Sequence, residues 1–114
     1  MTGELSFFEL GTGDYEGARA FYSELFGWEF ESTEGGGRIS TPTVPGGIHP
    51  NDAGASPYVF FAVDDLDAAI AMVNELGGSG EAMDENPETV AEFGRFALCK
   101  DDQGSSFGLH QRPA

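Results

Sequence analysis

Apolar residues follow two kinds of pattern along this chain: short continuous runs and repeats at helical spacing. The runs at residues 5–10 and 58–63 are rich in aromatic and β-branched residues, which is typical of strands buried on both faces. After each run, apolar residues recur at steps of three and four, which predicts helices over residues 14–26 and 65–77. The residues of these stripes are Ala18, Phe21, Tyr22 and Leu25 in the first helix, and Leu66, Ala69, Ile70, Val73 and Leu76 in the second.

The order of elements repeats at an offset of 51 residues, which places Phe7 on Tyr58 and Asp14 on Asp65. Strand-like pieces separated by turn residues follow each helix, at residues 28–31, 38–44 and 47–49 in the first half, and at 79–83, 95–100 and 106–111 in the second. Each half therefore has the order βαβββ. We predict one domain of two modules, at about residues 4–49 and 58–112, joined by a linker at residues 50–57.

Cap and turn residues mark the boundaries of these elements. Asp14 and Asp65 stand where a side chain accepts hydrogen bonds from the first N–H groups of a helix. Gly27 and Gly77 stand where a left-handed residue ends one. Residues 84–92 contain four acids and a proline, which predicts a mobile flap or, as the alternative, a solvated loop.

Charge excludes several classes of partner. The 114 residues include 20 Asp and Glu against 5 Lys and Arg, a formal net charge of −15. No basic stripe is present to neutralise phosphates, so we expect neither nucleic-acid binding nor attraction to an anionic membrane. The acidity fits either an ordinary carboxylate-rich surface or a protein from a high-salt cytoplasm, where ions screen the self-repulsion.

Cysteine usage and the first residues favour a cytoplasmic protein. The single cysteine, Cys99, excludes an intramolecular disulfide, and it lies in an apolar strand where an inert buried thiol is expected. No apolar run approaches the ~20 residues that span a bilayer. The first six residues lack the basic and apolar regions of a signal peptide.

Three segments in this order resemble the vicinal oxygen chelate (VOC) superfamily, which includes glyoxalases, extradiol dioxygenases and bleomycin-resistance proteins. They are GARAFYSELFGWEF after the first strand, VDDLDAAIAMVNELGG after the fifth, and the closing GRFALCKDDQGSSFGLHQ. The resemblance covers about residues 4 to 112. It implies an α+β fold in which two tandem βαβββ modules form curved mixed sheets around a cup-shaped cavity.

The resemblance also implies four metal-ligand positions, on the first and last strands of each module. They fall on Phe7, on Tyr58, on Gly108 and near residues 46–48. Phe7 and Gly108 have no coordinating atom, and the phenol of Tyr58 is a poor ligand. We therefore expect no cofactor, and a divalent metal is possible but disfavoured.

Alternation along the strands places one set of residues on the concave face: Phe7, Glu9, Tyr58, Phe60, Gly108 and His110. We predict that these line a small-molecule site. Glu9 is the best candidate for a catalytic group, because a carboxylate within an apolar strand is costly unless it is paired or faces a ligand. His110 is expected to be hydrogen-bonded, whereas His49 is expected to be solvated.

Three functions remain open. The first is a metal-free binding protein of the resistance type, which holds a small cationic or amphipathic molecule. The second is an enzyme of glyoxalase, isomerase or dioxygenase type, with a rearranged metal site or with Glu9 as general base. The third is a non-catalytic assembly or regulatory module. We further expect a homodimer, since aromatic residues left exposed on the concave face would mark an interface.

Overall fold

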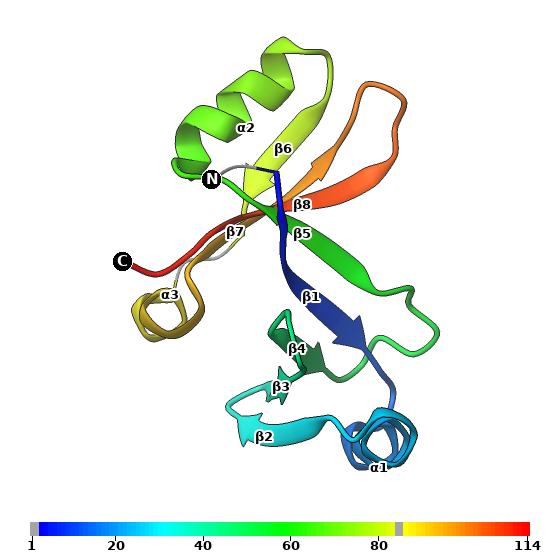
Figure 1. The fold of residues 1–114 in the computed structure, drawn as a ribbon. Coiled ribbons are helices and arrows are strands. Elements are labelled where there is room, and N and C mark those ends of the chain that lie inside the picture. Colours follow the sequence, from blue (N-terminus) through cyan, green and yellow to red (C-terminus); the bar gives the residue numbers. More distant parts are fainter. Residues whose placement is uncertain (1–2, 84–85) are drawn as a thin grey trace. The chain divides into compact units, whose positions relative to one another are not determined.

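The computed structural model describes residues 3–83 and 86–114, which separate into two compact units (Figure 1). One unit is Phe7–Tyr58, and the other combines the described residues up to Ser6 with Val59–Ala114. The helices are α1 (Tyr15–Phe26), α2 (Leu66–Glu75) and α3 (Pro87–Phe93). The strands are β1 (Leu5–Gly11), β2 (Glu29–Thr33), β3 (Gly36–Ser40), β4 (Gly46–His49), β5 (Tyr58–Ala62), β6 (Ser79–Ala82), β7 (Arg95–Lys100) and β8 (Ser106–Gln111). No helix within the described ranges is long and apolar enough to cross a membrane.

The first unit contains a mixed sheet with one helix on it. Its strands lie in the order β2-β3-β4-β1, with β2, β3 and β4 antiparallel and with β4 parallel to β1. The core on one face of the sheet centres on Leu10, Ile39 and Ile48, each at most 7% exposed. The partly buried residues packed against this cluster are Phe8, Tyr15, Ala18, Tyr22, Trp28 and Phe30, three of them from α1.

The ends of α1 show one confirmed expectation and one that is wrong. Gly27 ends the helix with φ at 75°, and its N–H donates to the carbonyl of Ser23 at 2.8 Å. Asp14 precedes the helix in an extended conformation, but its side chain accepts no capping hydrogen bond. Its Oδ2 lies only 2.7 Å from the point where a Cβ on Gly17 would stand, so the carboxylate occupies space that a larger residue would fill.

The second unit repeats this topology. Its strands lie in the order β5-β8-β7-β6, with β5 parallel to β8 and the other pairs antiparallel. The core joins Leu66 of α2 to Ala97, Cys99 and Leu109 of the sheet. Asp65 caps α2 as expected, accepting the N–H of Ala68 at 3.1 Å. The two βαβββ modules expected from the sequence repeat are thus confirmed.

The segment expected to be a flap forms a helix instead. α3 covers seven residues, begins at a proline that needs no N–H partner, and is capped by Asn86, which accepts the N–H of Glu88 at 2.9 Å. The acidic residues of this segment led us to expect a loop, although the order Asn-Pro-Glu is itself a signal for the start of a helix. Residues 84–85, which were part of the same expectation, lie outside the described residues.

Candidate functional site

The Glu9 carboxylate lies over a glycine on the neighbouring strand. In the parallel pair of β1 and β4, Glu9 is opposite Gly47 and Gly11 is opposite His49. A Cβ on Gly47 would collide with Oε1 of Glu9, so this glycine provides the space in which the carboxylate lies. The Glu9 side chain is 25% exposed and is therefore partly withdrawn from water.

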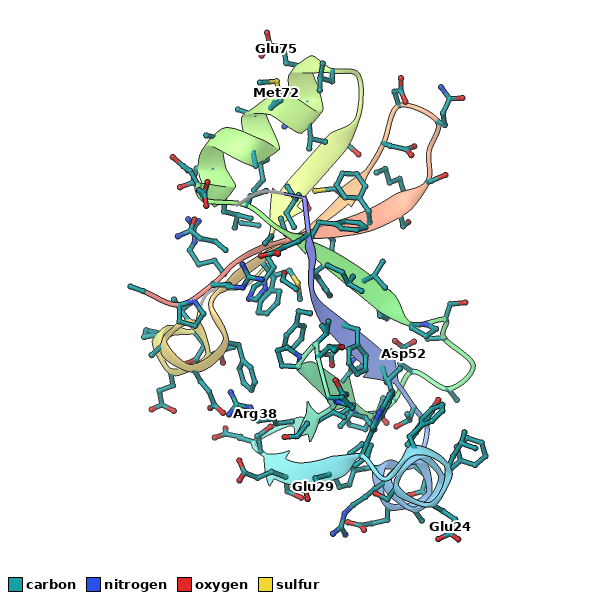
Figure 2. All side chains as sticks on the ribbon, viewed as in Figure 1. Glu24, Glu29, Arg38, Asp52, Met72 and Glu75 are labelled. Carbon is teal, nitrogen blue, oxygen red and sulfur yellow. The ribbon has the colours of Figure 1, made fainter. Side chains whose placement is uncertain are left out.

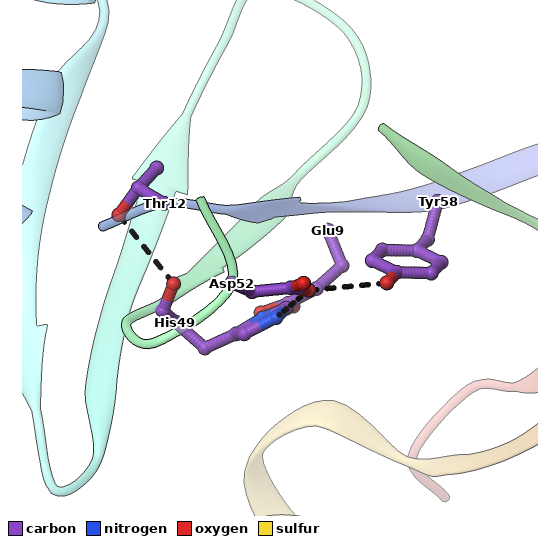
Figure 3. A network of polar contacts seen from close by, with 5 residues as sticks. All are labelled: Glu9, Thr12, His49, Asp52 and Tyr58. Carbon is purple, nitrogen blue, oxygen red and sulfur yellow. Dashed lines mark hydrogen bonds and ion pairs between the residues drawn. The ribbon is translucent and has the colours of Figure 1, made fainter. Parts of the chain in front are cut away.

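His49 connects Glu9 to a second carboxylate. Its Nδ1 lies 2.6 Å from Oε2 of Glu9, and its Nε2 lies 2.9 Å from Oδ2 of Asp52 (Figure 3). Residues two positions apart along a strand lie on the same face, so His49 is on the same side of β4 as the space above Gly47. The expectation that His49 is merely solvated is wrong, because both of its ring nitrogens have carboxylate partners.

The turn after β4 brings Asp52 and Tyr58 into the network. The N–H of Asp52 donates to the carbonyl of Thr12 at 3.0 Å, and the N–H of Thr12 donates to the carbonyl of His49 at 2.9 Å. The hydroxyl of Tyr58 donates to Oδ2 of Asp52 at 3.1 Å. Oδ2 therefore accepts from an imidazole and a phenol together, in a chain that runs from Tyr58 through Asp52 and His49 to Glu9 (Figure 3).

The pKa values of the four groups follow from this arrangement. Burial raises the pKa of Glu9, and the opposing effect of His49 does not cancel it. Burial lowers the pKa of His49, but its hydrogen bonds to Glu9 and Asp52 outweigh that effect, so the net pKa is raised. Hydrogen bonds from His49 and Tyr58 lower the pKa of Asp52, and the contact with Asp52 raises the pKa of Tyr58.

The pKa values of Glu9 and His49 are both raised, which favours a proton at the contact between them. An imidazole that donates from both nitrogens to carboxylates is an imidazolium. Its proton on Nδ1 faces a carboxylate whose own pKa is raised by burial, so either partner is able to carry it. The arrangement is thus suited to accepting or donating a proton, and to binding a group that donates hydrogen bonds.

The second unit has an aromatic cluster at the equivalent positions. Phe60 is opposite Gly108, as Glu9 is opposite Gly47, and its ring fills the space above that glycine. The ring of Phe96 meets Phe60 edge-on, with 5.1 Å between ring centroids. The same face that is polar in one unit is therefore apolar in the other.

His110 is the counterpart of His49, because its register partner Ala62 falls on Gly11 at the 51-residue offset. It is 3% exposed and stacks on Phe96 at 4.5 Å between centroids. The Ser6 hydroxyl lies 2.8 Å from Nδ1, and the Phe93 carbonyl lies 2.7 Å from Nε2. These distances fit a neutral ring that accepts from Ser6 and donates to Phe93. Burial lowers its pKa, and the hydrogen-bonded histidine expected from the sequence is confirmed.

The remaining predicted site residues differ in burial and lie in different units. Phe7 and Phe60 are 5% and 3% exposed, so they are buried, while Tyr58 is 37% exposed. Of the three aromatic residues behind the homodimer expectation, only Tyr58 is exposed, and the homodimer stays a prediction. Glu9 and Tyr58 belong to one unit, whereas Phe60, Gly108 and His110 belong to the other.

The sequence reasoning missed His49 and Asp52 as site residues. Alternation along β4 contained the signal for His49, since it stands two positions after Gly47 and shares its face. Asp52 had no such signal, because it lies in a turn whose path the strand pattern does not determine. Cys99 is buried, and burial raises the pKa of its thiol, which agrees with the inert thiol expected.

Two sets of four strands in the same order, each with a helix packed on it, define a protein built from two βαβββ units. The chain belongs to the Glyoxalase/Bleomycin resistance protein/Dioxygenase superfamily, whose family model matches residues 4–109. The resemblance noted in the sequence is thus confirmed.

Individual relatives agree with this assignment. The chain is 30% identical to a glyoxylase-like domain-containing protein of Didymella fabae, over 99% of this chain and 97% of that protein. It is 32% identical to the glyoxylase candidate CFP32 of Mycobacterium bovis, over 90% of this chain, and spans only 43% of that relative. Its fold is similar to that of methylmalonyl-CoA epimerase from Mycobacterium tuberculosis, with a TM-score of 0.68 and 18% identity, covering 97% of this chain and 88% of that one.

Proposed function

We propose that this protein binds a small molecule on the Glu9 face of its first unit and does so without a metal ion. The observation that carries the proposal is the Glu9 carboxylate: Oε2 is held by His49, while Oε1 lies over Gly47. No described residue donates a hydrogen bond to Oε1. A ligand that carries an ammonium or another hydrogen-bond donor would complete this carboxylate, and the net charge of −15 would attract a cation.

The residues at the family's ligand positions do not fit a divalent ion. Gly47 is the first-unit counterpart of Gly108 by strand register, and neither glycine has a donor atom. The space above each is filled, by the Glu9 carboxylate in one unit and by the Phe60 ring in the other. Within the described residues, no three His, Cys, Asp or Glu side chains form a group that could hold a metal. In the Glu9 network, both nitrogens of His49 already face carboxylates.

Benzylamine tests the binding proposal, because it joins an ammonium to an aromatic ring. Titration followed by two-dimensional amide NMR in 0.3 M NaCl should move resonances around Glu9, His49 and Tyr58. Benzoate at the same concentrations should not move them. Glu9→Gln should weaken benzylamine binding by about tenfold, the magnitude of one charge-assisted hydrogen bond.

Glu24→Gln is the matched control, because Glu24 is exposed on α1 and points to solvent (Figure 2). It should leave benzylamine binding unchanged. Equal binding by the wild type and Glu9→Gln, or shifts scattered over the acidic surface, would contradict the proposal and favour an assembly or regulatory module. About one equivalent of transition metal in protein purified without chelator would contradict its metal-free part.

A second candidate function is proton transfer, with Glu9 as general base. The 2.6 Å contact between Glu9 and His49, and the raised pKa of Glu9, favour it. Dihydroxyacetone in D₂O is a suitable probe: Glu9 would remove a carbon-bound proton to leave an enediolate, and deuterium would return to carbon. Loss of the C–H signal by ¹H NMR should be faster with the wild type than with Glu9→Gln. Equal rates would contradict this candidate.

A further inference from the structure

The turn that follows β4 is folded back onto the end of β1. Two backbone hydrogen bonds hold it there, from Thr12 to His49 at 2.9 Å and from Asp52 to Thr12 at 3.0 Å. Asn51, between them, has φ at 60°, a left-handed conformation that asparagine tolerates better than most residues. The backbone position of Asp52 is therefore fixed by β1, the strand that also carries Glu9.

The Asp52 side chain is 34% exposed, and three neighbouring residues contact its carboxylate. Its carboxylate lies over Gly11, where a Cβ would stand 2.7 Å from Cγ and closer still to Oδ2. On the other side, the Tyr58 hydroxyl donates to it, and the Tyr58 ring lies 6.1 Å from the His49 ring between centroids. Contacts with Gly11, Tyr58 and His49 thus hold this carboxylate beside the end of β1.

Asp52 in turn determines how His49 faces Glu9. An imidazole ring turns about its χ2 torsion unless both nitrogens are engaged. With Asp52 in place, Nε2 points to the turn and Nδ1 points to Glu9. Without that carboxylate, Nε2 has no acceptor among the described residues, and the imidazolium form loses one of its two counter-charges.

We propose that the segment joining β4 to β5 is a working part of the Glu9 site, in which Asp52, supported by Gly11 and Tyr58, is the positioning residue that holds His49 protonated and aimed at Glu9. The proposal deepens the proposed function, since it concerns the same carboxylate. It makes the affinity of Glu9 for a hydrogen-bond donor or cation depend on a residue outside the strands. Asp52 acts through His49 and does not itself contact the ligand.

Among the described residues, charged and titratable groups approach His49 from three elements: β1, β3 and the segment from Asp52 to Tyr58. β1 contributes Glu9, the turn contributes Asp52, and the start of β5 contributes Tyr58. On the neighbouring β3, Gly36 comes alongside His49 and has no side chain, whereas Arg38 is opposite Gly47 and is the cation on the face that Glu9 and His49 share. Both carboxylates favour the charged ring, so removing Asp52 leaves Glu9 as the one carboxylate among the described residues that holds the His49 proton.

The experiment compares the ¹⁵N and ¹H NMR titration of the His49 ring in the wild type, Asp52→Asn and Gly11→Ala. Asp52→Asn removes the charge and keeps an acceptor of similar shape. Gly11→Ala keeps every titratable group but displaces the carboxylate. In both variants His49 should titrate at lower pH than in the wild type. The second histidine, His110, is an internal control and should titrate unchanged.

Asp102→Asn serves as the matched control, because Asp102 is exposed and lies in the other unit. It should leave His49 unchanged. An unchanged His49 midpoint in both Asp52→Asn and Gly11→Ala would overturn the proposal. Binding of benzylamine is read separately: Asp52→Asn should weaken it several-fold. If the wild type binds no benzylamine, the proposed function fails, while the His49 titration still decides the role of Asp52.

Discussion

Replacing His110 with phenylalanine should lower the stability of the second unit without removing its aromatic stack. The phenylalanine ring is able to keep the contact with Phe96, where the centroids now lie 4.5 Å apart and nearly parallel. Both hydrogen bonds of His110 would be lost, leaving the buried Ser6 hydroxyl and the Phe93 carbonyl without that partner. Each buried group left unsatisfied costs about 1–3 kcal/mol.

The expected loss in the free energy of unfolding is about 2–4 kcal/mol, less than two full penalties, because the hydrogen bond to the Phe93 carbonyl is only partly buried. For a domain of this size that corresponds to a fall in Tm of about 8–16 °C. Urea denaturation and calorimetry at pH 8, where His110 is neutral, would measure both quantities. Ser6→Ala added to His110→Phe should restore part of the loss, since the orphaned hydroxyl is then absent.

His49→Phe is the matched control for this prediction. It changes the equivalent strand position in the first unit, where the histidine and its partners are one-quarter to one-third exposed. Pairs reached by water contribute little to stability, so this variant should be affected much less than His110→Phe. If His110→Phe unfolds within about 0.5 kcal/mol of the wild type, the assigned hydrogen bonds do not contribute as described.

Two further predictions concern pH and salt. The two histidines should titrate on opposite sides of the ordinary value, His49 above it and His110 below it, and ring NMR signals assigned with His49→Gln and His110→Gln would show this. His49 therefore stabilises the fold at pH values below the ordinary histidine pKa, and this contribution is lost as pH rises through its raised pKa. His110 is neutral in the fold, so it lowers stability as pH falls below the ordinary histidine pKa. Raising NaCl from 0.1 M to 1 M shortens the Debye length from ~10 Å to ~3 Å. Because the net charge of −15 is then screened, Tm should rise. A Tm that does not change with salt would show that the carboxylates are already compensated.

The fold was predictable because the sequence repeats its own pattern. Buried strands and amphipathic helices differ in periodicity, and the 51-residue offset that places Phe7 on Tyr58 aligned the second module with the first. The bounds of β7 and β8 were predicted to the residue, and the turn chemistry at Asp101 and Gly104 explains the two ends that face each other. The helix α3 was missed because its acidic residues resemble a solvated loop, and helical packing does not show in charge alone.

The candidate site was only half predictable. Glu9 was identified because a carboxylate in an apolar strand is costly, and this cost is visible in the sequence alone. His49 was judged by its neighbours in the chain, whereas strand register determines its partners. Asp52 reaches the site through a turn, and the path of a turn depends on backbone hydrogen bonds such as that between Asp52 and Thr12.

Gly47 and Gly108 have a consequence for how this architecture diversifies. Each leaves an empty volume beside a first-strand residue, and that residue alone decides what fills it: a carboxylate from Glu9 in one half, a ring from Phe60 in the other. A single codon change in the first strand therefore alters the character of one half while the opposite backbone stays as it is. Two halves with one strand order therefore carry chemically unlike side chains at the same position, because the glycine opposite leaves room for either.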